Sequence, residues 1–472
     1  MRNATHSLVL LACLAGLVQA APTMSNKDFN DLKKEAQKAA ARGANSEVAS
    51  RLRELARDDS DRAIAFISDL AVRIPDMAVY EAARDAIAGM ETPEAVDALV
   101  DKVGKDRNPM VRILLVDAIA ERTCDRSAAG IAAALGDRTE EVLRAAIGAA
   151  KKRKAIQAVD ALIDLVAKHE SGRDAEGLLI NSAREALTHI TGEAFAKAAD
   201  WRNFWEPRKA SFRPRTGGEA PRVAGGTGER ARPRFFGSEI RSNRIAFVID
   251  VSGSMEAADP PPRGVEVAPG ESRVRMERAK QQLLAVIEAL PDDCRFAMLA
   301  YSGILYQSGA GVVLPQGTPT DGPLPWTLGG FEWLKAFKPR IVQANSRTKA
   351  EAKEWVSNLK ANGSTFTFNA LKAAFEIEGI DTIVLLSDGM PTEVHRSNNA
   401  SMSTDEILKE VQALNRFRRL RIDTFGFEMG DDVGGGGGGG SRAGGRRAGG
   451  GGLGKFMLDL AAQNGGTYTQ IQ

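Results

Sequence analysis

Ile245-Ala-Phe-Val-Ile-Asp250-Val-Ser252-Gly-Ser254-Met255 is the stretch that decides the fold, because an unbroken apolar run ends there at a carboxylate and two hydroxyls. An apolar side chain at every position is typical of a strand covered on both faces, as in a parallel sheet flanked by helices. Ligands of such sheets bind at the carboxyl ends of the strands. We therefore expect Asp250 to lie at the ligand-binding edge of a buried sheet.

Two later stretches carry matching side chains. Gly363-Ser-Thr365 offers a hydroxyl before a predicted helix, and Ile383-Val-Leu-Leu-Ser-Asp388 repeats the apolar run that ends at an aspartate. Carboxylate and hydroxyl oxygens suit Mg²⁺ or Mn²⁺ better than Zn²⁺ or Cu²⁺. The three loops can therefore converge on one divalent cation. The alternative is a set of strand ends with Asx and Ser turns and no metal.

Together the three segments closely resemble a von Willebrand factor A (VWA) domain, and the resemblance covers nearly all of residues 242–472. It implies a metal-ion-dependent adhesion site (MIDAS), built from D-x-S-x-S, a Thr and an Asp in this order. It also implies a doubly wound, Rossmann-like α/β fold. The metal ligands implied by the resemblance are Asp250, Ser252, Ser254, Thr365 and Asp388.

The rest of residues 242–472 alternates between helical and strand patterns, as a doubly wound sheet requires. Amphipathic helices are expected at 275–290, 349–359, 369–375, 405–414 and 456–462. Further strands are expected at 294–301, 382–386 and 422–427, with 467–471 as an edge strand.

Three segments depart from a compact VWA domain. A Pro-rich insertion at 256–272 follows the metal-binding loop, and a Gly- and Pro-rich insertion runs over 304–346. Either insertion can shape, cover or block the site. Residues 431–453 are so rich in glycine that they cannot bury enough apolar surface to fold, so we expect a loop.

Residues 24–205 contain little glycine and carry apolar side chains at helical spacing. A short motif recurs around four alanines at steps of 32, 31 and 37 residues, namely Ala86, Ala118, Ala149 and Ala186. Pairs of short helices at this period resemble HEAT-type solenoid repeats, in which each pair buries its apolar face against the next. An irregular helical bundle is the alternative.

Aromatic side chains and then a Pro-rich segment follow the last repeat. Trp201, Phe204 and Trp205 are expected to cover the end of the repeats or to join their core, rather than to stack on a ligand. Residues 206–241 bring Pro, Gly and Arg together without periodic apolar side chains. This segment is predicted to be a semi-extended linker, in preference to an arginine-rich surface for nucleic acid or envelope polymers.

The amino terminus carries a targeting pattern. Leu8 to Val18 is apolar but too short to span a bilayer, and the following residues end at the small side chain of Ala20. This pattern is typical of a signal peptide over 1–20 and predicts an exported protein, periplasmic or secreted. A lipoprotein anchored through Cys13 and an ordinary buried helix are the alternatives.

Composition narrows the class of protein. A chain of 472 residues is too long for one ordinary core, so two or three domains are expected. A net charge of +2 predicts no general attraction to nucleic acid or membranes, and no later segment is long and apolar enough to span a bilayer.

The histidines and cysteines argue against two further kinds of site. The four histidines are scattered, which argues against a zinc site. Cys124 and Cys294 fall in different predicted domains, so no disulfide framework is expected.

These observations favour a non-enzymatic, metal-dependent protein-binding protein. The resemblance implies a partner that presents an acidic side chain to the metal, and the repeats offer a surface for a second partner. One alternative is a structural scaffold whose metal site is vestigial or occluded. Another is a Mg²⁺-dependent phosphoester hydrolase, but such sites of the haloacid-dehalogenase type need D-x-D, and Ser252 replaces the second aspartate.

Overall fold

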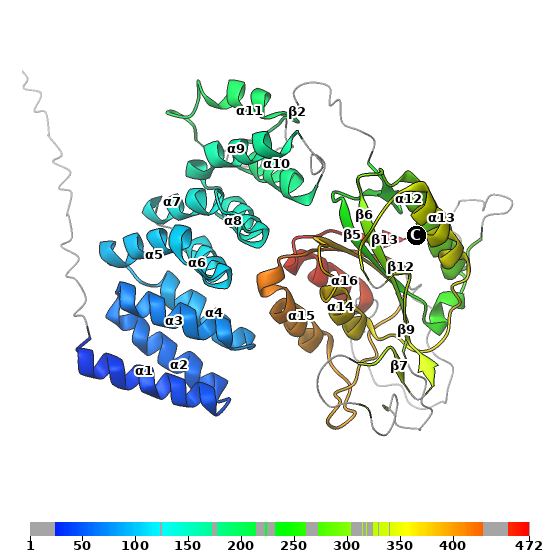
Figure 1. Ribbon diagram of the computed structural model, residues 1–472, viewed down its shortest axis with the longest axis horizontal. Helices are drawn as coiled ribbons and strands as arrows, with labels where there is room; N and C mark the ends of the chain where they lie inside the picture. Colours follow the sequence, from blue (N-terminus) through cyan, green and yellow to red (C-terminus); the bar gives the residue numbers. More distant parts are fainter. Residues whose placement is uncertain are drawn as a thin grey trace, which may run out of the picture.

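The computed structural model describes residues 24–471, except 123–124, 172–176, 214–221, 224–231, 261–271, 304–313, 315–317, 319–323, 329, 339 and 428–451. The predicted signal peptide 1–20, with Cys13, and Cys124 lie outside the described residues. A helical array and an α/β domain lie side by side (Figure 1). None of the described helices is long and apolar enough to cross a membrane.

Eleven helices of the described chain build the array. They are α1 (Asn26–Ala41), α2 (Asn45–Leu55), α3 (Asp61–Arg73), α4 (Met77–Ala88), α5 (Pro93–Lys105), α6 (Pro109–Glu121), α7 (Asp125–Ala134), α8 (Glu140–Arg153), α9 (Val159–His169), α10 (Leu178–Thr191) and α11 (Ala198–Trp205). Several of these helices begin directly after a residue whose side chain caps the first turn. Thr92 and Asn108 are such caps, and they immediately precede Pro93 and Pro109.

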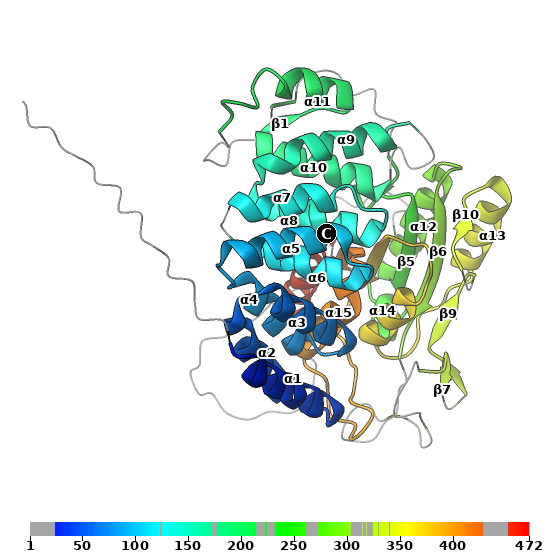
Figure 2. The same cartoon turned by 60° about the vertical axis from the view of Figure 1, so that its left-hand side comes forward.

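The helices stack in two layers (Figure 2). Helices α2, α4, α6, α8 and α10 contact one another in sequence, while α3, α5 and α7 form the second layer and α9 packs on α11. The four recurring alanines lie in α4, α6, α8 and α10, so the sequence repeat marks successive helices of one layer. Trp201 and Trp205 of α11 are buried in the same hydrophobic core, where we expected them.

The α/β domain is built on a sheet with the order β10-β6-β5-β11-β12-β13. Its parallel strands are β5 (Arg244–Asp250), β6 (Arg295–Tyr301), β11 (Thr382–Ser387), β12 (Arg421–Phe427) and β13 (Tyr468–Ile471). Strand β13 ends the path at one edge, as the sequence predicts. The parallel order makes all five carboxyl ends meet at one edge of the sheet.

Helices cover both faces of this sheet. Alternate residues of β5 join different cores: Ala246 and Val248 pack with α14 (Thr367–Phe375), α15 (Thr404–Arg418) and α16 (Gly452–Gln463). Phe247 and Ile249 pack on the other face with α12 (Arg275–Ala289) and α13 (Ser346–Ser357). The unbroken apolar run of β5 is therefore explained by burial on both sides.

The segment predicted as the insertion 304–346 contributes to the sheet. Short strands β9 (Leu334–Ala336) and β10 (Val342–Gln343) both pair antiparallel with β6, and β7 (Thr327–Leu328) pairs with β8 (Phe331–Glu332). The sequence prediction missed these strands because each is only two or three residues long and carries polar side chains among the apolar ones.

Two predicted boundaries differ from the structure. The end of the predicted linker 206–241 forms a hairpin of β3 (Arg234–Phe235) and β4 (Ser238–Glu239), and Phe235 is fully buried against Phe425 of β12. The α/β core therefore begins before residue 242. The predicted loop 431–453 lies largely outside the described residues, but its last two positions begin α16, where Leu453 is buried.

The helical array packs against the amino ends of the strands. Arg244 at the start of β5 bonds Glu140 of α8 at 2.5 Å, and Arg144 donates to the carbonyl of Arg418 at the end of α15. Tyr80 of α4 meets Phe417 edge-to-face at a ring distance of 5.6 Å. This interface leaves the carboxyl ends of the strands on the opposite side.

Candidate metal centre

Three loops at the carboxyl ends of the strands hold the five predicted ligands. Asp250 ends β5, and Asp388 directly follows β11. These two strands are parallel neighbours, with Leu386 opposite Ile249, so the two carboxylates leave the sheet side by side. Thr365 lies in the third loop, just before α14.

Hydrogen bonds connect four of these residues into one chain. The backbone N–H of Ser252 donates to Asp250 Oδ1 at 2.8 Å, and the hydroxyls of Ser252 and Ser254 are 3.0 Å apart. The Ser254 hydroxyl then donates to Asp388 Oδ1 at 2.7 Å. The D-x-S-x-S loop and the second aspartate are therefore in direct contact.

Thr365, in the third loop, lies close to the same residues. Its backbone N–H donates to the Thr392 hydroxyl at 2.9 Å, which ties this loop to the one that carries Asp388. A Cβ placed on Gly389 would lie 3.4 Å from Thr365 Oγ1 and 3.7 Å from Ser254 Oγ. The hydroxyls of Thr365 and Ser254 thus both lie beside Gly389, and all five predicted residues come together.

Gly363 permits the close approach of these loops. Its φ of +83° is in the left-handed region that favours glycine, and an added Cβ would lie only 2.2 Å from the carbonyl oxygen of Gly303. The Gly363 carbonyl accepts the Gly253 N–H at 2.9 Å, inside the D-x-S-x-S loop. A side chain at Gly363 would therefore separate the loops that carry the candidate ligands.

The two carboxylates differ in their surroundings. Asp250 is fully buried and accepts bonds from neutral donors, including the Ser387 hydroxyl at 2.6 Å. Burial, followed by the nearby charge of Asp388, raises the pKa of Asp250 to about 7. Asp388 is also fully buried, whereas Ser254 is exposed. The site therefore places buried negative charge behind a hydroxyl that faces solvent.

The donor set fits a hard divalent cation. It offers two carboxylates and three hydroxyls, and a buried carboxylate with only neutral donors is stabilised by a cation. In the part of the chain that the structure describes, no group of three or more His, Cys, Asp or Glu side chains is placed to hold a metal ion. The candidate centre therefore depends on Ser and Thr oxygens, and it suits Mg²⁺ or Mn²⁺ better than Zn²⁺.

A buried arginine beside the site was missed by the sequence analysis. Arg275, the first residue of α12, donates from Nη1 to Asp388 Oδ2 at 2.9 Å and from Nε to Asp259 Oδ1 at 2.7 Å. Arg278 binds the other oxygen of Asp259 at 2.5 Å. The sequence gives no signal for this contact, because Arg275 and Asp388 are 113 residues apart.

Glu393 is a second residue that the sequence analysis missed. Its Oε1 accepts the N–H groups of Phe368 and Asn369 in the first turn of α14, directly after the Thr365 loop. The other oxygen, Oε2, is buried without a hydrogen-bond partner among the described residues. Burial raises the pKa of Glu393 to about 8.

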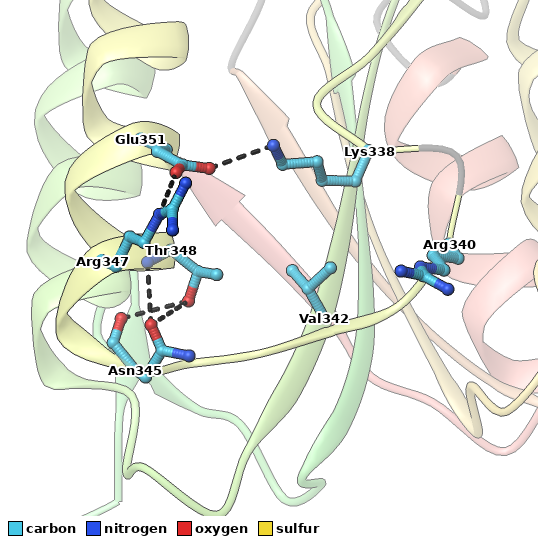
Figure 3. Close-up of a pocket in the computed structure, with 7 residues that line it drawn as sticks. All are labelled: Lys338, Arg340, Val342, Asn345, Arg347, Thr348 and Glu351. Carbon is cyan, nitrogen blue, oxygen red and sulfur yellow. Dashed lines mark hydrogen bonds and ion pairs between the residues drawn. The ribbon is translucent and has the colours of Figure 1, made fainter.

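The hollow drawn in Figure 3 is separate from these residues. It lies between edge strand β10 and the start of α13, where Lys338 and Arg347 both pair with Glu351, at 3.0 and 2.9 Å. None of the five candidate ligands lines it. Since no candidate ligand lines this hollow, it is not part of the candidate centre.

Solved structures with low similarity include a von Willebrand factor type A protein from Catenulispora acidiphila, 20% identical with a TM-score of 0.29. That alignment covers 48% of this chain and 38% of the other. An aerotolerance-related membrane protein from Bacteroides fragilis, with multiple mutations to serines, is 14% identical with a TM-score of 0.27, over 48% of this chain and 90% of that one.

No family model matches the chain. Human von Willebrand factor A domain-containing protein 3A is 29% identical over 104 residues, and protein 3B, also human, is 26% identical over 98 residues. These alignments cover 22% and 21% of this chain but only 8% and 7% of the relatives, so the chain matches a small part of each. The two matches support a von Willebrand factor A domain in the chain described here.

Proposed function

We propose that this chain is a non-enzymatic protein-binding protein whose VWA domain captures its partner through a divalent cation at a MIDAS. The hydrogen-bonded chain from Asp250 through Ser252 and Ser254 to Asp388 carries the proposal. In the proposed site, these residues and Thr365 hold Mg²⁺ or Mn²⁺.

The number of donors indicates what the partner can supply. Five donor oxygens leave one of the six positions of an octahedral cation such as Mg²⁺ free to accept a further, negatively charged oxygen. Ser254 and Met390 beside the site are exposed, so a partner can approach from solvent. We propose that the partner contributes an acidic side chain, as the resemblance to VWA domains implies.

The helical array supports this role as a scaffold with HEAT-like repeats. The two-layer stack, in which successive helices of one layer contact each other, agrees with such an arrangement. Its layer of α4, α6, α8 and α10 holds the α/β domain, so a second partner would bind elsewhere on the array. We further propose that the protein is exported, on the pattern of residues 1–20.

A calorimetric titration with Mg²⁺ and with Mn²⁺ tests the metal site directly. Wild type should release or absorb heat with a defined stoichiometry of one ion, and a soluble acidic peptide should then bind only in the presence of the ion. Chelator should abolish peptide binding. Equal peptide binding with and without chelator would contradict metal-dependent capture.

One observation favours the second candidate, a scaffold whose metal site is vestigial. Asp388 already pairs with a cation, the Arg275 guanidinium. If that pair excludes divalent ions, wild type will show no heat of Mg²⁺ or Mn²⁺ binding at millimolar concentrations.

A further inference from the structure

Arg275 joins the candidate metal site to the base of the insertion 256–272. Its side chain is buried and contacts two carboxylates, Asp388 of the site and Asp259 of the insertion. Ala258 and Val274 pair as an antiparallel bridge, and the Arg275 N–H donates to the carbonyl of Ala257 at 3.0 Å. The guanidinium is therefore fixed in position by both backbone and side-chain contacts.

Both oxygens of Asp388 have a partner in this arrangement. Ser254 donates to Oδ1, and Arg275 donates to Oδ2. Bonds from a guanidinium to a carboxylate are stronger than bonds between neutral groups, and burial removes competing water. Asp250 instead receives neutral donors. One of the two carboxylates of the site is thus compensated by the protein itself.

We propose that Arg275 is a positioning residue that acts as an internal counter-cation of the metal site. It stabilises Asp388 in the metal-free protein, fixes which oxygen of Asp388 faces the site, and lowers the affinity for a divalent cation. The reason is electrostatic: a divalent ion that binds near Asp388 is repelled by the guanidinium and must share the carboxylate with it. This inference rests on the proposed function, because it concerns the same metal site.

The contacts also link the site to the insertion. Asp259 holds Arg275 through Nε, and its own backbone N–H donates to the carbonyl of Arg273 at 2.9 Å. A cation that draws Asp388 away from Arg275 leaves the guanidinium with Asp259 alone. Metal occupancy and the base of the insertion are therefore coupled through one side chain.

Calorimetric titration of the full chain with Mg²⁺ tests the inference. Arg275→Gln should bind Mg²⁺ at least about tenfold more tightly than wild type, because the repulsion and the competing bond are both removed. Arg275→Lys keeps the positive charge and should stay within about threefold of wild type. Arg273→Gln is the matched control: it removes a charge from the same segment, but this guanidinium binds the carbonyl of Pro260 at 2.7 Å.

The outcomes separate this inference from the proposed function. If wild type binds Mg²⁺ and a folded Arg275→Gln binds it no more tightly, the counter-cation role is wrong while the metal site stands. If neither protein binds Mg²⁺, the metal-dependent function fails and the proposed competition fails with it. If Arg273→Gln gains as much affinity as Arg275→Gln, the effect is one of net charge and the specific role is overturned.

A metal-free measurement provides a second readout. Thermal unfolding in chelator of Arg275→Gln, Asp388→Asn and the double variant forms a double-mutant cycle. The double variant should be destabilised by clearly less than the sum of the single effects. Additive effects would mean that Arg275 does not compensate Asp388 in the folded protein, and the inference would be rejected.

Discussion

Arg244 and Asp250 lie at opposite ends of the same strand, β5. Arg244 bonds Glu140 of the helical array at the amino end, whereas Asp250 joins the candidate metal centre at the carboxyl end. One strand therefore connects the interface between the two parts with the proposed binding site. The array can hold the α/β domain without covering that site.

We expect the two partners of Arg244 to contribute very differently to stability. Arg244→Met leaves Asp381, which is 1% exposed, without its cation at 3.0 Å, and should cost about 3–5 kcal/mol of unfolding free energy. Glu140→Gln removes only the more exposed partner and should cost about 1 kcal/mol. Urea denaturation measures both. Equal losses would mean that the contact with Asp381 does not anchor Arg244.

Cleavage of the linker should not separate the two parts. The arginines within residues 206–231 predict that mild trypsin treatment cuts there. The bonds that Arg244, Arg144 and Arg419 make across the interface should then hold both fragments together. Size-exclusion chromatography should show one peak in low salt, and urea should split it. Two peaks at once in low salt would show that the interface is too weak to hold the parts together.

Asp250→Asn should weaken Mg²⁺ binding and raise the unfolding free energy of the metal-free protein. The amide keeps the shape of the side chain but removes the charge that binds a cation, so Mg²⁺ affinity should fall at least about 100-fold. The same change removes a buried charge, so metal-free protein at about pH 8 should gain on the order of 2 kcal/mol of unfolding free energy. Ser252→Ala is the matched control and should weaken Mg²⁺ binding less, since water can replace one neutral oxygen. Lost stability in Asp250→Asn would contradict this account.

Much of the α/β domain could be predicted because its strands are apolar at nearly every position. The runs of β5 and β11 end at Asp250 and next to Asp388, and the burial of both faces makes such runs recognisable. The positions of four candidate ligands could be predicted for the same reason, because Asp250, Ser252, Ser254 and Asp388 lie at or just after the ends of these strands, whereas Thr365 precedes α14. The local sequence is therefore enough to predict the position of a site residue that lies at the end of a buried strand.

Contacts between distant segments could not be predicted in this way. Arg275 and Asp259 look like ordinary surface charges of a helix start and an insertion, and only folding brings them to Asp388. Glu140 and Arg244 are 104 residues apart and lie in different parts of the protein. Charged pairs of this kind leave no periodic pattern, unlike the apolar faces of helices and strands.

Magnesium affinity should depend on pH around neutrality. Because the pKa of Asp250 is raised to about 7, this carboxyl is protonated below that pH and must lose its proton to bind the ion. Affinity should therefore fall by up to about tenfold for each pH unit below 7 and level off above it. Titrations in buffers of different ionisation enthalpy should show proton release at about pH 6. The same affinity at pH 6 and pH 8 would contradict a raised pKa for Asp250.

Glu393 should make the metal-free protein less stable as pH rises. Its pKa in the folded protein is about 8, above the ordinary value near 4.3 of an unfolded chain. The carboxyl therefore loses its proton first in the unfolded state. As a result, the unfolding free energy falls as pH rises between those two values and levels off above about pH 8.

Glu393→Gln tests this dependence, because its amide can still accept the N–H groups of Phe368 and Asn369 but does not ionise. In chelator, its unfolding free energy should match wild type near pH 4 and exceed it by about 2–4 kcal/mol near pH 8. Glu378→Gln, at an exposed position, should keep the wild-type slope, and an unchanged slope in Glu393→Gln would show that this buried carboxyl is not the source.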